Sequence, residues 1–121
     1  MHRFIAILVV LFSAAFAWAE YADIVINTRA EEEGVSPVIY PHWFHRIRYQ
    51  CSVCHVDLGF RMSAGGNGIS MDRISNGEFC GACHNGEIAW SAENCDLCHS
   101  GRPGLVTGIK RGHTTLGPGV Y

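Results

Sequence analysis

The chain has 121 residues, with nine basic and eleven acidic side chains and a formal net charge of −2 at pH 7. This length corresponds to one small domain, and the few, dispersed basic residues exclude a basic stripe for binding nucleic acid. The chain also contains six cysteines and seven histidines, and their spacing decides the rest of the interpretation.

Residues 1–19 are predicted to form a secretory signal peptide. A short basic start at His2 and Arg3 leads into an apolar run over residues 4–16, followed by a small-x-small cleavage pattern at residues 17–19. The apolar run is shorter than the roughly 20 residues of a membrane span. We therefore expect cleavage, no integral membrane segment in the mature chain, and a periplasmic location, with an extracellular location as the alternative.

The mature chain is predicted to begin with a short β-hairpin. Asp23–Asn27 and Val35–Tyr40 are runs rich in β-branched residues, and the acidic segment Glu31–Gly34 between them has the composition of a turn. No chemistry is expected in this hairpin.

The pattern Cys-x-x-Cys-His occurs three times and contains all six cysteines of the chain. The copies lie at Cys51–His55, Cys80–His84 and Cys95–His99. This pattern is the attachment signature of c-type haem, in which two thiols bind the porphyrin edge and the histidine binds the iron. Cysteines at i and i+3 lie one helical turn apart, so a short helix can present both to one haem. We therefore expect three haem c groups, attached through Cys51, Cys54, Cys80, Cys83, Cys95 and Cys98.

Zinc binding and disulfide formation are the alternative interpretations of these cysteines. A structural zinc site closes paired Cys-x-x-Cys units on one tetrahedral metal, with no reason for histidine to follow each second cysteine. Disulfides in small secreted domains follow no such rule either. With seven histidines in 121 residues, three such placements by chance have a probability of roughly two in ten thousand. Haem attachment is therefore favoured over both alternatives.

The segments between and after the motifs carry weaker signals. Ser70 is the expected N-cap of a short helix over Met71–Ser75, and Gly77 is the expected stop. Residues 103–121 are glycine-rich without hydrophobic periodicity and are predicted to form an extended tail. The haem-binding domain is accordingly expected over residues 20–102.

Three six-coordinate irons need six axial ligands, and the motif histidines His55, His84 and His99 supply one to each. His42 and His45 follow a proline that suits the first turn of a helix, so both should lie on one helical face. Two histidines one turn apart cannot bind opposite sides of one iron. We therefore expect each of them to serve a different haem.

The sixth ligand of the remaining haem is not fixed by spacing. The candidates are Met71, Met62 and His113, and the other alternative is an open or water-filled site. His113 lies in the glycine-rich tail, which would have to fold back to reach an iron. Methionine is an established haem ligand that raises the reduction potential relative to histidine. The residues alone leave this choice open.

The arrangement resembles the c7-type triheme cytochromes, which are relatives of the cytochrome c3 group. The matching features run from Asp23 to His99, and they are the hairpin, His42-x-x-His45, the three motifs and the segment Ile69-Ser70-Met71. This chain departs from familiar members in lacking a histidine shortly before the second motif and in having one lysine, Lys110.

The resemblance implies specific ligand pairs. In that family the first distal histidine serves the first haem and the second serves the middle haem, which implies the pairs His42 with His55 and His45 with His84. Some family domains use methionine for the last haem. Carried over, this places Met71 opposite His99, with His113 as the alternative.

Together these observations predict a small, irregular, haem-cored multihaem cytochrome c, with a short N-terminal β-hairpin and short helices and loops around three haems. Saturated irons leave no site for a substrate, so we expect an electron carrier rather than an enzyme. Its expected partners are other redox proteins: inner-membrane or periplasmic donors and periplasmic or outer-membrane acceptors. The alternatives are a subunit of a larger haem wire or membrane-associated complex, and a small metal-ion or oxyanion reductase with an open haem.

Overall fold

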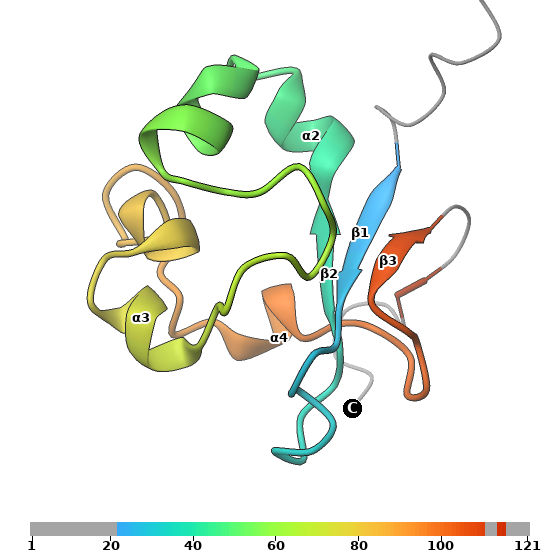
Figure 1. Cartoon of the computed structure of the whole chain (residues 1–121). Helices are drawn as coiled ribbons and strands as arrows, with labels where there is room; N and C mark the ends of the chain where they lie inside the picture. Colours follow the sequence, from blue (N-terminus) through green and yellow to red (C-terminus); the bar gives the residue numbers. More distant parts are fainter. Residues whose placement is uncertain (1–21, 111–113, 116–121) are drawn as a thin grey trace, which may run out of the picture.

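The structure is a computed structural model that describes residues 22–110 and 114–115. The predicted signal peptide over residues 1–19 and the candidate ligand His113 lie outside the described residues. Figure 1 shows a small sheet on one side of the molecule and a series of short helical segments on the other, joined by long connections.

The sheet has three antiparallel strands in the order β2-β1-β3. Strands β1 (Asp23–Ile26) and β2 (Val38–Pro41) pair as the predicted N-terminal hairpin. Strand β2 begins later than the expected Val35, because the fully buried Pro37 has no N–H to donate to a strand ladder. The hairpin is therefore confirmed, with a shorter second strand.

The third strand, β3 (Gly108–Lys110), lies in the segment predicted to be an extended tail. It pairs with β1 on the side opposite to β2. The Asn27 backbone N–H donates to Thr107 Oγ1 at 2.9 Å, and the Asn27 side-chain amide donates to the Leu105 carbonyl at 2.8 Å. These contacts depend on the open edge of β1 and not on a local hydrophobic pattern. The structure thus corrects the expectation of a tail without regular elements.

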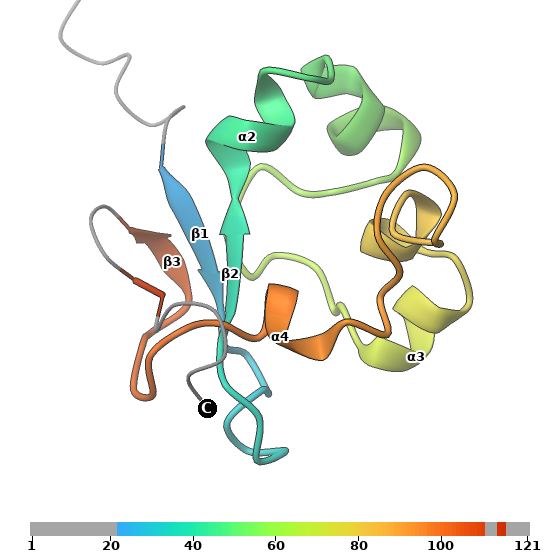
Figure 2. The same ribbon diagram turned by 180° about the vertical axis from the view of Figure 1, so that it is seen from behind.

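All five helical segments of the described chain are five residues or shorter. They are α2 (His42–Arg46), the π-helix η3 (Val53–Asp57), α3 (Met71–Ser75), the 3-10 helix η4 (Phe79–Ala82) and α4 (Cys95–Cys98). Figures 1 and 2 show α2 at one end of the molecule and α3 and α4 toward the other. Among the described residues no helix has the length and apolar character needed to cross a membrane.

Helix α3 has the ends that the sequence predicts. The Ser70 hydroxyl accepts a hydrogen bond from the Arg73 N–H at 3.4 Å, which caps the first turn. At the other end Gly77 adopts a φ of +84°, and the Glu78 N–H donates to the Arg73 carbonyl at 3.0 Å. This is the left-handed glycine stop of a Schellman motif, and it delivers the chain directly into the second Cys-x-x-Cys-His copy.

The apolar core of the polypeptide is small. Its buried apolar side chains within the described ranges are those of Ala22, Val25, Pro37, Ile39 and Phe79. Many larger apolar side chains next to the motifs are at least 39% exposed, among them Trp43, Phe44, Ile47, Tyr49, Val56, Met71, Ile88, Trp90 and Leu97. A chain of this size that buries so little apolar surface needs a further apolar group to stabilise its fold.

Gly81 lies inside the second motif and packs against α3. A Cβ added there would lie 1.9 Å from the Ile74 carbonyl oxygen, so the two segments would have to separate. We expect Gly81→Ala to lower the free energy of unfolding of the haem-loaded protein by about 1–3 kcal/mol, measured by denaturant unfolding. Gly68→Ala is the matched control, because nothing lies within 4 Å of a Cβ at that position. Equal stability of the two variants would contradict this packing.

Candidate haem-binding site

The second and third motifs each close a helical turn. The His84 N–H donates to the Cys80 carbonyl at 2.8 Å, and the His99 N–H donates to the Cys95 carbonyl at 2.8 Å. These bonds from i+4 to i are those of a single α-turn. They hold each histidine one turn beyond the first cysteine of its motif, as the spacing predicts.

The first motif runs into a wider helix. Within the π-helix η3 the Leu58 N–H donates to the Val53 carbonyl at 3.1 Å, and just beyond it the Phe60 N–H donates to the Cys54 carbonyl at 2.9 Å. Single π-turns are rare and occur frequently at functional sites. The Cys-x-x-Cys-His spacing does not distinguish this wider turn from an α-turn, so the sequence did not predict it.

Two pairs of histidine rings lie at nearly the same separation. The ring centroids of His42 and His55 are 6.4 Å apart, and those of His45 and His84 are 6.2 Å apart. Two imidazoles on opposite sides of one metal ion, with metal–nitrogen bonds of about 2.0 Å and nitrogens roughly 1.1 Å from each ring centre, have centroids roughly 6.2 Å apart. Both observed separations therefore match the space that one iron requires between two histidines.

Four histidines hold Nδ1 against a backbone carbonyl oxygen. The pairs are His45 with Pro41 at 3.1 Å, His55 with Phe60 at 2.8 Å, His84 with Trp90 at 2.9 Å and His99 with Ser36 at 2.6 Å. A carbonyl oxygen only accepts, so each Nδ1 carries the proton and each Nε2 presents its lone pair. Metal-binding histidines characteristically donate their other ring N–H in this way. The four rings thus leave Nε2 as the nitrogen that could bind a metal ion.

Burial sets the protonation states around the motifs. Burial lowers the pKa of His45, and the nearby His84 lowers it further, so the ring is neutral, as a metal ligand must be. Burial raises the pKa of the Cys98 thiol to about 11 and also raises the pKa of Cys80. Burial likewise raises the pKa of Tyr40, whose ring centroid lies 4.4 Å from that of His45.

The donor set fits haem better than zinc or disulfides. In the part of the chain that the structure describes, no group of three or more His, Cys, Asp or Glu side chains is placed to hold a metal ion. A structural zinc site needs four such ligands, whereas haem supplies the equatorial nitrogens and needs at most two axial protein ligands. None of the six cysteines forms a disulfide, and exposed aromatic side chains beside the motifs suit a flat apolar group.

The two remaining methionine candidates occupy different settings. Met71 is the first residue of α3, and His99 directly follows α4; both helices lie away from α2 (Figure 1). Met62 is 80% exposed, whereas Met71 is 49% exposed. The structure therefore places Met71 on an element at the same end of the molecule as the third motif.

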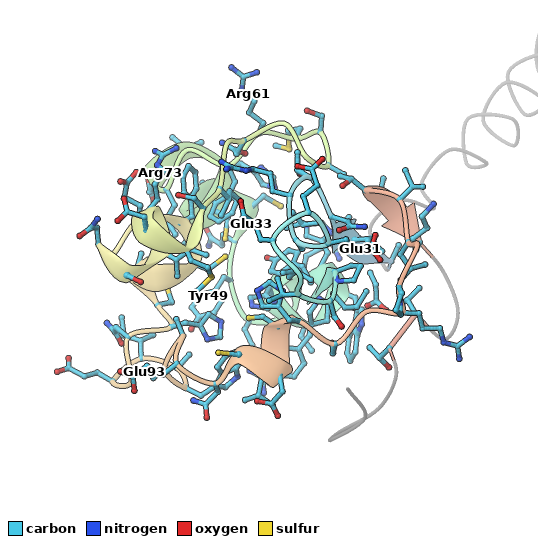
Figure 3. All side chains as sticks on the ribbon, turned by 90° about the horizontal axis from the view of Figure 1, so that it is seen from below. Glu31, Glu33, Tyr49, Arg61, Arg73 and Glu93 are labelled. Carbon is cyan, nitrogen blue, oxygen red and sulfur yellow. The ribbon has the colours of Figure 1, made fainter. Side chains whose placement is uncertain are left out.

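The contacts that orient the histidine rings could not be predicted from the sequence. The carbonyl groups that accept from the histidine rings belong to residues of unrelated types, because any residue can supply a backbone carbonyl. The partner of His99, Ser36, lies 63 positions earlier in the chain, and only the folded sheet brings the two together. Charged side chains such as Arg61 and Glu93 instead point outward at the periphery (Figure 3).

Comparisons with known proteins indicate the family of this chain. The family model for cytochrome c7 and related cytochrome c matches residues 38–100, which contain all three motifs together with His42 and His45. No curated protein matches the chain.

Two solved structures are similar to the chain. A c7-type three-heme cytochrome domain is 35% identical with a TM-score of 0.57, and the match covers 64% of this chain and 91% of that domain. The C-terminal hexaheme fragment of GSU1996 is 34% identical with a TM-score of 0.55, and the match covers 64% of this chain and 47% of that fragment. This chain therefore belongs to the cytochrome c7 family. It is a multihaem cytochrome with three covalently bound haem c groups, and it serves electron transfer.

Proposed function

We propose that this protein is a periplasmic electron carrier in which two haems have two histidine ligands each and one has a histidine and a methionine. The observation that carries the proposal is the pair of ring separations, 6.4 Å for His42 and His55 and 6.2 Å for His45 and His84. The thioether bonds are assigned to Cys51, Cys54, Cys80, Cys83, Cys95 and Cys98, two in each motif.

In this proposal each bound haem supplies a one-electron iron couple, and the protein sets the potential of that couple. The Nδ1–H groups of His55, His84 and His99 donate to carbonyl oxygens, which makes each imidazole a more basic ligand. A more basic ligand stabilises ferric iron and lowers the reduction potential. We therefore expect two low potentials for the bis-histidine haems, and a higher one where Met71 replaces a histidine.

The chain also keeps its haem sites close to one another. Helix α2 carries both His42 and His45, so the proposed sites of the first and second motifs share one short helix. The second and third motifs are joined by residues 85–94 alone, a length that holds their haem sites close together. Electrons can therefore enter at one site and leave at another without a substrate pocket.

A second candidate function is a unit of a larger haem wire. One similar structure is a hexaheme fragment, and the match to this chain covers 47% of that fragment. We propose this role as the alternative to a separate carrier, with other redox proteins as partners in both cases. Light scattering of the haem-loaded protein distinguishes a monomeric carrier from an assembly.

The methionine assignment predicts a specific spectral change. We expect Met71→Ala to abolish the red charge-transfer band of methionine-ligated ferric haem and to lower the number of low-spin haems by one. Met62→Ala is the matched control, since Met62 is 80% exposed, and it should leave the spectrum unchanged. A wild-type spectrum without the band, unaltered in Met71→Ala but altered in His113→Ala, would assign the ligand to His113.

A further inference from the structure

Phe79, which directly precedes the second motif, has an unusual backbone conformation. It is the one non-glycine residue with a positive φ in the described part of the chain, at +50°. Bulky residues rarely adopt this left-handed region, and they do so where the surrounding structure holds them there. The Phe79 side chain is also one of the few that are buried, with 8% exposed.

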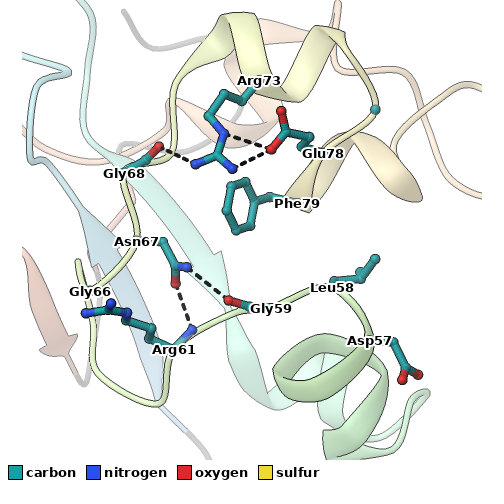
Figure 4. A pocket seen from close by; sticks show the side chains of 11 residues that line it. Asp57, Leu58, Gly59, Arg61, Gly66, Asn67, Gly68, Arg73, Glu78 and Phe79 are labelled. Carbon is teal, nitrogen blue, oxygen red and sulfur yellow. Dashed lines mark hydrogen bonds and ion pairs between the residues drawn. The ribbon is translucent and has the colours of Figure 1, made fainter.

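The Phe79 ring contacts one aromatic and one cationic side chain. Its centroid lies 5.1 Å from that of Phe60 in an edge-to-face arrangement. The Arg73 guanidinium carbon lies 4.4 Å from the ring centroid on another side. Figure 4 shows Arg73 held in place by Glu78 and by the Gly68 carbonyl, with Nε to Glu78 Oε2 at 2.8 Å and Nη1 to Gly68 O at 3.2 Å.

The same Phe60 is part of the environment of the first motif. Its carbonyl oxygen accepts from His55 Nδ1 at 2.8 Å, and its N–H donates to the Cys54 carbonyl at 2.9 Å. Phe60 thus touches Phe79 through its ring and His55 through its backbone. This continuous set of contacts joins the residue before the second motif to the histidine of the first.

We propose that Phe79 is a positioning residue for His55. Its ring holds Phe60 so that the Phe60 carbonyl accepts the His55 Nδ1 proton, and the reduction potential of the first haem therefore depends on the residue that precedes the second motif. The inference rests on the proposed function in taking His55 as an iron ligand. Loosening Phe60 weakens the hydrogen bond, makes His55 a less basic ligand and raises the potential of that haem.

The test uses four substitutions of Phe79 in the haem-loaded protein and potentials resolved for each haem by NMR-monitored redox titration. Phe79→Tyr keeps the ring and should retain the wild-type potential. Phe79→Ala, Phe79→Leu and Phe79→Gly remove the ring and should favour reduction of the first haem about tenfold, or about 59 mV for one electron, with the third haem unchanged. Ile109→Ala, on the exposed face of β3, is the matched control and should change none of the three reduction potentials.

The Phe79→Gly variant distinguishes the effect of the aromatic ring from the effect of the backbone conformation. It adopts a φ of +50° without strain, so Phe79→Gly would match the wild type if only the backbone conformation mattered, and that result would overturn the proposal. Equal shifts of all three haems, or none, would overturn it as well. If the Phe79 variants do not accumulate, the Arg73→Met variant provides the test. It removes the cation beside the Phe79 ring and should raise the reduction potential of the first haem.

Failure of this inference and failure of the proposed function give different results. If the wild type carries three low-spin haems but Phe79 substitutions leave the first potential unchanged, the ligand assignment stands and the positioning role is overturned. If the spectrum of the wild-type protein shows that two histidines do not bind the first haem, the proposed function fails and this inference fails with it.

Discussion

Replacing His42 by alanine is expected to leave one of the three irons five-coordinate and high spin, while the other two stay low spin. The reason is the proposed pairing of His42 with His55, whose rings lie 6.4 Å apart. Electron paramagnetic resonance of the ferric protein counts the high-spin irons, and carbon monoxide should bind to the ferrous form at one haem per chain. His42→Met should restore six-coordination and raise the potential of that haem by about 0.1 V or more, within the roughly 0.8 V range that axial ligands span.

His45→Ala provides the matched comparison on the same helix. It should make the middle haem high spin, because the ring of His45 lies 6.2 Å from that of His84. The double variant should then contain two high-spin irons, since each histidine serves a different site. Three low-spin irons in either single variant, or two high-spin irons in one of them, would contradict the ligand pairs.

The haem-free chain is expected to be largely unfolded. The described residues bury five apolar side chains, Ala22, Val25, Pro37, Ile39 and Phe79, which is too little apolar surface for a chain of this length to fold alone. Circular dichroism of a variant with all six cysteines changed to alanine should show little ordered structure and no cooperative melting transition. The haem-loaded protein is the control, and its free energy of unfolding should be roughly 5–15 kcal/mol. A native-like spectrum of the haem-free variant would contradict a haem-cored fold.

The sequence predicted those features that depend on local patterns. Three copies of one motif identify the cofactor, because each copy carries both attachment groups and a ligand within five residues. The spacing of His42 and His45 predicts two separate partners, since a helix fixes their relative direction. The cap at Ser70 and the stop at Gly77 define α3 for the same reason, because each acts within one turn.

Features that depend on the tertiary structure could not be predicted in this way. Strand β3 forms because β1 offers an open edge, and residues 108–110 carry no alternating pattern of their own. The hydrogen bond from His99 Nδ1 to the Ser36 carbonyl oxygen joins residues 63 positions apart. Because the acceptor is a backbone group, no side chain in the sequence indicates it. The left-handed conformation of Phe79 and its ring contacts with Phe60 and Arg73 likewise have no local pattern that marks them.

The most direct test of covalent haem attachment is the intact mass of the purified protein, combined with its haem-to-protein ratio. We predict the mass of the polypeptide plus three covalently attached haems, one for each Cys-x-x-Cys-His motif, and a ratio of three that survives denaturation. A ratio other than three, or loss of haem on denaturation, would contradict the assignment of the six cysteines and three motif histidines to haem c.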